Sequence, residues 1–251
     1  MKAILLSAGQ GSRLAPLTAD RPKCLLSVGS RTLIDWQLEA LKACGIPDVA
    51  VVIGFQAEMM EAHLARHDAP GFRVRPIFNP FYKVADNLAS CWMVRGELRG
   101  TCLLLNGDTL FEPRIARRLL DAPAAPITLT IDRKPRYDDD DMKVVTEGDQ
   151  LRAVGKKLSE GVNGESIGFS RFQADGAAIF VAELERTMRT KEGTGLWYLS
   201  AMNRLASSGA DVRVVSIEGL DWGELDFAAD LAPAKALAAA WQESPAAAKV
   251  A

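Results

Sequence analysis

Short apolar runs alternate with segments of helical periodicity along the first half of the chain. Residues 103–105 are all leucine, as expected of a strand buried on both faces. Ile34, Leu38 and Leu41 keep one face of the segment around them apolar, as in an amphipathic helix. The alternation predicts βαβ units, with strands over residues 2–8, 49–54, 73–79, 101–105 and 127–132 and helices over residues 33–44, 57–67, 86–95 and 113–122.

The pattern changes near residue 138. Residues 142–146 and 150–156 have the character of strands joined by the turn-forming Glu147-Gly148-Asp149, and residues 165–172 of another strand. Helices over 174–190 and 196–208, a strand over 212–217 and a last helix from near Ala228 complete the prediction. The fold class predicted is α/β, with a doubly wound, mostly parallel, Rossmann-like sheet and a small antiparallel extension.

The chain contains no internal repeat and no linker rich in glycine, serine or proline. We therefore predict one domain over residues 1–243, with halves over 1–132 and 133–243. Residues 244–251 are mostly small, which predicts a frayed tail.

Charge and composition exclude several classes of protein. The 30 basic and 32 acidic side chains leave a formal charge of −2, so no global positive field attracts nucleic acid or an anionic membrane. The first apolar run is too short for a secretion signal, and no stretch approaches the length of a membrane span. We therefore expect a cytoplasmic protein with neither nucleic acid nor membrane among its partners.

Cysteine and histidine give little sign of a metal centre. The four cysteines lie far apart, with no C-x-x-C pair. His63 and His67 have helical i,i+4 spacing, but the glutamate of a zinc protease motif is missing between them. We interpret both as histidines on the surface of a helix.

A long glycine-rich loop follows the first strand. Gly9 and Gly11 allow backbone N–H groups to approach phosphate oxygens, and Arg13 and Lys23 can neutralise phosphate charge. Leu14 stands where a dinucleotide-binding fingerprint needs glycine, and the Gly-Lys-Ser/Thr of a P-loop is absent. A plain connection between strand and helix would explain the glycines but not the cations, so we predict a loop that binds phosphates.

These residues resemble a known family. Residues 5–14 (LLSAGQGSRL) and 21–23 (RPK) are similar to the G-x-G-[ST]-R loop and downstream Pro-Lys of nucleotidyltransferases that activate sugar phosphates and related small phosphates. The similarity continues at residues 79–82 (NPFY), 86–90 (DNLAS), 106–108 (NGD), 164–168 (GESIG) and 222–226 (WGELD). The combination most resembles the bacterial phosphocholine and aminoethylphosphonate cytidylyltransferases.

The resemblance assigns residues 1–132 to nucleotide binding and residues 133–243 to acceptor binding. It implies catalytic roles for Arg13, Lys23 and Asp108. The nucleotide-binding residues that it implies are Leu6, Ala8, Gly9, Gly11, Ser12, Arg13, Lys23, Asn87, Ser90 and Gly107. Asp86 and Asn87 would equally suit the start of a helix, so the role of Asn87 at the base stays open.

Two acidic residues are the candidate metal ligands. Asp108 follows an apolar run, at the end of a predicted central strand, where a carboxylate suits Mg²⁺. The resemblance implies Asp226 as the second ligand. The alternatives are a turn residue at Asp108 and a helix N-cap at Asp226.

The acceptor half contains aromatic and acidic residues that suit a cationic head group. A solvated acidic loop and core tryptophans explain the same residues. The resemblance also brings lysines and a glutamate to the acceptor. The acceptor-binding residues predicted are Tyr137, Lys143, Lys156, Glu165 and Trp197.

The function predicted is Mg²⁺-dependent transfer of CMP from CTP to a small phosphorylated or phosphonate acceptor, with release of pyrophosphate. The partners are CTP and that acceptor, and a homodimer is a possible assembly. The alternatives are a sugar-1-phosphate nucleotidyltransferase using UTP, dTTP or GTP, a non-catalytic nucleotide-sensing module and an oxidoreductase.

Overall fold

The computed structural model describes residues 1–243, so the tail predicted over 244–251 lies outside the described residues. The chain forms two compact units built from discontinuous segments. The first unit contains Met1–Lys83, Leu105–Arg117 and the described residues from Leu220 on, and the second contains Val84–Leu104 and Arg118–Gly219. The chain passes between the units within β6 (Cys102–Asn106) and within α4 (Pro113–Asp121).

Three parallel strands form the sheet of the first unit, in the order β5-β4-β1. They are β1 (Lys2–Ser7), β4 (Asp48–Ile53) and β5 (Arg73–Phe78). The register pairs Leu5 with Val51 and Val51 with Pro76. Nearly every residue of β4 is buried, in agreement with its continuous apolar sequence.

Helices α1 (Leu33–Ala43) and α2 (Ala57–Leu64) follow β1 and β4 along the chain, as the alternation predicts. The long loop between β1 and α1 contains two 3-10 turns, η1 (Ser12–Leu14) and η2 (Lys23–Leu25), and the hairpin β2 (Ser27–Val28) and β3 (Arg31–Thr32). A second short pair, β7 (Thr109–Phe111) and β13 (Trp222–Glu224), is antiparallel. The 3-10 turn η4 (Ala228–Asp230) leads into α7 (Leu231–Glu243).

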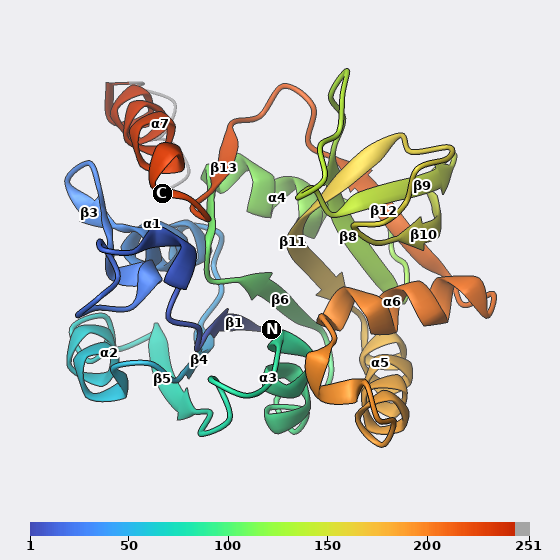
Figure 1. Ribbon diagram of the computed structural model, residues 1–251, viewed down its shortest axis with the longest axis horizontal. Helices are drawn as coiled ribbons and strands as arrows, with labels where there is room; N and C mark the ends of the chain where they lie inside the picture. Colours follow the sequence, from blue (N-terminus) through green and yellow to red (C-terminus); the bar gives the residue numbers. More distant parts are fainter. Residues whose placement is uncertain (244–251) are drawn as a thin grey trace. The chain divides into compact units, whose positions relative to one another are not determined.

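Helix α7 completes the apolar core of the first unit. Trp241 of α7 packs edge to face on Trp36 of α1, with ring centroids 5.8 Å apart. Leu14 of the glycine-rich loop belongs to the same core and is fully buried. Figure 1 shows this end of the chain beside α1 and β3, so residues from both ends of the sequence share one core.

The second unit contains a mixed sheet with the strand order β11-β8-β12-β10-β9. Parallel pairing joins β8 (Ile127–Asp132) to β12 (Val212–Ser216). Antiparallel pairing joins β8 to β11 (Gly164–Phe172), β9 (Lys143–Glu147) to β10 (Gln150–Val154), and β9 to β11. The helices of this unit are α3 (Asn87–Met93), α5 (Ala174–Met188) and α6 (Tyr198–Ser207), and a 3-10 turn, η3 (Gly193–Gly195), lies between α5 and α6.

The structure therefore has the α/β class predicted, with a mixed sheet. Antiparallel pairing extends beyond the hairpin expected near residue 148, because β11 also pairs with β8. All four cysteines are buried thiols. Among residues 1–243, no helix is both long and apolar enough to cross a membrane.

Candidate active site

The glycine-rich loop gives its two glycines different roles. Gly9 is exposed, and a Cβ atom there would meet no heavy atom within 4 Å. Gly11 has a φ of 73°, in the left-handed region, and a Cβ atom there would lie 2.9 Å from Cβ of Lys23. Gly11 is therefore needed for the turn and for the passage of Lys23 beside it.

Leu14 anchors this loop to the core behind it. Its side chain is fully buried, whereas Ser12 and Arg13, in the same 3-10 turn, are exposed. The carbonyl oxygen of Gly11 accepts a hydrogen bond from Oγ1 of Thr18, at 2.7 Å. The loop is thus fixed from one side and presents Ser12 and Arg13 on the other.

The pairing of β7 with β13 brings Asp108 and Asp226 together. Asp108 precedes β7, and Asp226 follows β13 by two residues. The register pairs Thr109 with Glu224, and N–H of Leu225 donates to the carbonyl oxygen of Asp108 at 3.1 Å. Two carboxylates that are far apart in the sequence therefore lie beside one another.

Lys23 lies between the two carboxylates. Its Nζ atom is 2.8 Å from Oδ2 of Asp108 and 2.8 Å from Oδ1 of Asp226. Nη1 of Arg13 lies 3.6 Å from Oδ2 of Asp226. Burial alone would lower the pKa of Lys23, but the charges of the two carboxylates raise it well above its ordinary value, so Lys23 is a fixed cation.

One oxygen of this cluster has no hydrogen-bond partner. In the described part of the chain, Oδ1 of Asp108 is buried and accepts no hydrogen bond, although Oδ2 is bound to Lys23. A buried carboxylate oxygen without a partner is unfavourable unless a cation or a donor meets it. The carboxylates of Asp108 and Asp226 therefore fit Mg²⁺, which prefers oxygen ligands and takes only one or two protein carboxylates.

The structure bears on the two alternative roles of these acids, a turn residue at Asp108 and a helix N-cap at Asp226. Asp108 does lie in a turn, between β6 and β7, but its side chain also binds Lys23. Phe227, rather than Asp226, is the N-cap of η4. Asp230 instead accepts a hydrogen bond from N–H of Asp226, at 2.8 Å, and so holds the backbone of the candidate metal ligand.

Gln37 of α1 is a supporting residue that was not predicted from the sequence. Its side chain is fully buried, and Nε2 donates to the carbonyl oxygens of Asn106 (2.7 Å) and Thr109 (2.8 Å). These two carbonyls flank the turn that contains Gly107 and Asp108. A glutamine on an otherwise apolar helix face was the only signal in the sequence.

Gly107 lies directly against β1. Its N–H donates to the carbonyl oxygen of Leu6, and a Cβ atom at this position would be 2.2 Å from Oγ of Ser7. Ala8 is buried, and its carbonyl oxygen accepts from N–H of Phe55. Leu6, Ala8 and Gly107 thus shape the backbone around the loop.

Arg21, the third cation of the loop, pairs with its exposed neighbour Asp20.

In the second unit, Asn87 is the first residue of α3. Its Oδ1 atom accepts a hydrogen bond from N–H of Tyr198 at 2.8 Å, and Ser90 in the same helix is buried. Asp86 is the N-cap but makes no side-chain cap hydrogen bond. Capping therefore does not explain Asn87, whose amide oxygen holds the start of α6 instead.

In the second unit, Lys134 lies between two carboxylates, the buried Glu165 and the half-buried Asp141. Nζ of Lys134 lies 2.7 Å from Oε2 of Glu165 and 2.8 Å from Oδ2 of Asp141. Burial and the nearby Asp141 raise the pKa of Glu165 to about 7, although Lys134 lowers it. Tyr137 also lies at Lys134, 5.9 Å from ammonium to ring centroid. Glu165 and Tyr137 are among the residues predicted from the sequence, whereas Lys134, which joins them, is not.

Lys156 and Trp197 line a second feature of this unit, a cavity of about 520 Å³. Nζ of Lys156 lies 5.1 Å from the Trp197 ring centroid and 2.6 Å from Oδ1 of Asp140. Trp197 is exposed. Lys143 is buried, and its Nζ donates to the carbonyl oxygen of Lys156 at 2.8 Å, so it supports the cavity wall.

Comparison with known proteins adds the family. The family described as "Nucleotidyl transferase" matches residues 2–155. CTP:phosphoglutamine cytidylyltransferase of Campylobacter jejuni is 26% identical over 92% of this chain and 98% of that protein. CMP-5'-(3-aminopropyl)phosphonate synthase of Streptomyces rubellomurinus is 29% identical over 92% of this chain but only 37% of that protein. The solved CTP:phosphocholine cytidylyltransferase of Streptococcus pneumoniae has a TM-score of 0.76 at 23% identity, covering 94% of this chain and 98% of that one.

Proposed function

Because this chain belongs to the nucleotidyl transferase family, we propose that it transfers CMP from CTP to a small phosphorylated or phosphonate acceptor. The observation that carries the proposal is the convergence of Asp108 and Asp226 on Lys23, with Arg13 beside them. The relatives named above, which use CTP or form CMP products, support cytosine as the base. Family membership also removes the oxidoreductase alternative.

In the proposed reaction, an oxygen of the ionised acceptor attacks the α-phosphorus of CTP. A new P–O bond forms, the bond to the bridging oxygen of the β-phosphate breaks, and pyrophosphate leaves with that electron pair. Arg13 and Lys23 stabilise the charge that develops on the leaving group. The acceptor oxygen is already ionised, so no side chain has to remove a proton from it. Mg²⁺ held by Asp108 and Asp226 would supply further neutralisation of phosphate charge.

Base recognition is assigned to the start of α3. The amide oxygen of Asn87 is already bound to the backbone of Tyr198, so its NH₂ group is the candidate donor to the acceptor atoms of cytosine.

For the acceptor, the cavity at Trp197 supports a cationic head group. The ammonium of Lys156 already lies over the Trp197 ring and beside Asp140, so this corner accepts a positive charge. A quaternary ammonium or an amine of the acceptor would displace the Lys156 ammonium from the ring and pair with Asp139, an acid of segment 138–141 that lines the cavity. The acceptor class proposed is therefore a small phosphate or phosphonate that carries a cationic nitrogen.

The test is a matrix of reactions with purified protein and Mg²⁺. Each of CTP, UTP, dTTP, GTP and ATP is paired with phosphocholine, aminoethylphosphonate and glucose 1-phosphate, and pyrophosphate release is measured. We expect release with CTP and a nitrogen-containing acceptor. Release only with a sugar phosphate would replace the proposal by the sugar-nucleotide alternative, and silence in every pairing would favour a nucleotide sensor.

A further inference from the structure

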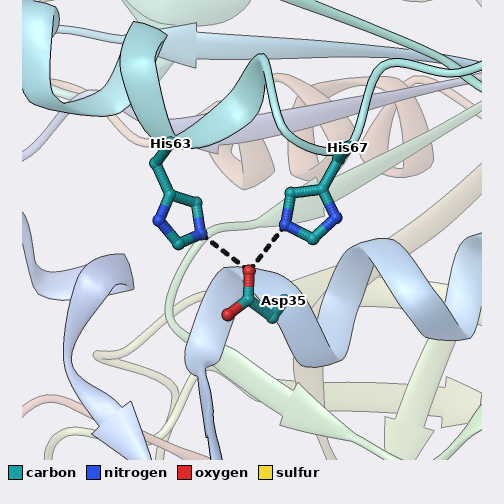
Figure 2. Close-up of side chains that lie close together, drawn as sticks. All are labelled: Asp35, His63 and His67. Atoms are coloured by element: carbon teal, nitrogen blue, oxygen red, sulfur yellow. Dashed lines mark hydrogen bonds and ion pairs between the residues drawn. The ribbon is translucent and has the colours of Figure 1, made fainter.

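Three potential metal ligands meet in the first unit, on residues that the proposed reaction does not use. They are Asp35 of α1 and the two histidines His63 and His67 (Figure 2). Oδ1 of Asp35 lies 2.7 Å from Nε2 of His63 and 2.8 Å from Nε2 of His67. All three ligand atoms lie within 4.8 Å of one another.

The two histidines do not have the helix-surface positions that their spacing predicts. His63 lies in the last turn of α2, and His67 lies beyond its end, with N–H of His67 bound to the carbonyl oxygen of Leu64. Only 12% of the His63 side chain and 22% of the His67 side chain are exposed. Both rings point from the α2 segment toward Asp35, as Figure 2 shows. The side chains of all three residues remain partly exposed to solvent.

Asp35 is fixed in place by the start of its own helix. Its Oδ2 atom accepts a hydrogen bond from N–H of Thr32 at 2.9 Å, and its own N–H donates to Oγ1 of Thr32. This capping box uses Oδ2 and leaves Oδ1 for the histidines. Burial would raise the pKa of Asp35, but hydrogen bonds from His63, His67 and Thr32 lower it, so the carboxylate is ionised.

We propose that Asp35, His63 and His67 bind one divalent transition-metal ion, with Zn²⁺ the best match. Two imidazoles and one carboxylate are a ligand set that zinc uses, with bonds of about 2.0–2.2 Å, and they leave a fourth position for water. Neighbouring ligands of such an ion lie about 3.3 Å apart, so Oδ1 has to move about 0.5 Å from each nitrogen, and the two nitrogens, which lie within 4.8 Å of one another, have to adjust to the same separation. Thr32 supplies the second-shell hydrogen bond that orients a ligating carboxylate.

This site differs in chemistry from the carboxylates at Lys23. Mg²⁺ prefers oxygen ligands, whereas imidazole favours zinc, copper and nickel. Without a metal, the same residues can form a hydrogen-bonded tether in which two neutral imidazoles donate to one carboxylate oxygen. The experiment therefore has to distinguish metal binding from this tether.

The sequence offers a clean probe, because the protein has only two histidines. Tag-free, EDTA-treated protein is titrated with Zn²⁺ in excess Mg²⁺ while the histidine ring signals are followed by NMR. We expect both sets of ring signals to shift together and to stop shifting at one equivalent. Unchanged ring signals, or a response of one histidine alone, would overturn the proposal in favour of the tether.

A substitution supplies the second measurement. His67→Gln, in the exposed turn after α2, should weaken Zn²⁺ binding at least about tenfold, the smaller loss seen when a supporting group of a metal site is removed. Asp20→Asn, which changes an exposed acid outside both candidate metal sites, is the control and should bind Zn²⁺ as the parent protein does. Equal zinc affinity in His67→Gln and the parent, measured with a competing chelator, would contradict the assignment. If His67→Gln fails to fold, the titration of the parent protein decides.

Discussion

The ammonium of Lys23 lies 2.8 Å from a carboxylate oxygen of Asp108, 85 residues further along the chain. This contact joins the glycine-rich loop to the turn after β6. It places a fixed positive charge beside the acid whose second oxygen has no hydrogen-bond partner among the residues that the structure describes. The same lysine reaches Asp226, 203 residues away, so one side chain connects three separate segments of the first unit.

Lys23→Ala should lower kcat by about 10²–10³, because it removes a preorganised cation from the proposed leaving-group site. Steady-state pyrophosphate release measures the effect. Arg21→Ala is the control, since Arg21 pairs with its surface neighbour Asp20 and should keep the parent rate. Equal rates for Lys23→Ala and Arg21→Ala would contradict a role of Lys23 in stabilising the leaving group.

Asp108→Asn should lower turnover by at least about 10² and raise the Mg²⁺ concentration needed for half-maximal rate, because an amide is a weaker ligand for a hard cation. Rates are measured over a Mg²⁺ series. Asp20→Asn changes an exposed acid in the same way and serves as the control. An unchanged Mg²⁺ requirement in Asp108→Asn would place the metal elsewhere.

Gln37→Leu should lower kcat more than it changes KM for CTP, because the turn that contains Asp108 loses both hydrogen bonds from the side chain. The half-buried Asn106 and the buried Thr109 lose the donor to their carbonyl oxygens, which should also reduce the free energy of unfolding by about 1–3 kcal/mol. Urea unfolding and steady-state kinetics measure the two effects. A stability loss with unchanged kcat would show that Gln37 supports the fold alone.

Trp197→Ala should raise KM for the acceptor by about tenfold and leave KM for CTP nearly unchanged, because it removes the aromatic face proposed for the cationic nitrogen. Trp197→Phe keeps a ring and should recover most of the affinity. Equal KM values for the acceptor in Trp197→Ala and Trp197→Phe would contradict the proposal that the ring binds the cationic nitrogen.

The raised pKa of Glu165 predicts a pH dependence of stability. Between about pH 4.5 and 7, the folded protein keeps a proton that the unfolded chain releases, so the free energy of unfolding falls as pH rises through this interval. The lowered pKa of Asp141 acts only below about pH 4, outside the interval. Glutamine does not titrate, so Glu165→Gln should lose less stability than the parent protein between pH 5 and 8. Urea unfolding of both proteins over this range measures the difference. Parallel curves for the two proteins would contradict the shift.

Local patterns predicted most helices and strands of this fold. The strand over 127–132 is β8, and the helix over 33–44 is α1 within one residue, because burial imposes a period on each segment. The strands β7 and β13 were not predicted, since three residues are too few to show a period. Their register, which brings Asp226 to Asp108, depends on tertiary contacts that no local pattern records.

In the candidate site too, some residues could be predicted from local sequence patterns and others could not. Glycines and cations in one loop pointed to phosphate binding, and the resemblance supplied Asp226. Gln37 and Lys134 were missed, because a single polar residue in a helix or a loop has no special pattern until its partners are known. His63 and His67 were interpreted as surface residues, because nothing near them in the sequence indicates that the start of α1 faces them.

The burial of Leu14 in the same core as Trp36 and Trp241 has a consequence for synthesis on the ribosome. The hydrophobic core around the turn at Leu14 is contributed partly by α7, which is translated much later than the turn. During synthesis, the turn at Leu14 therefore emerges from the ribosome long before this part of its core, and the core is complete only once α7 has been translated and has packed against α1.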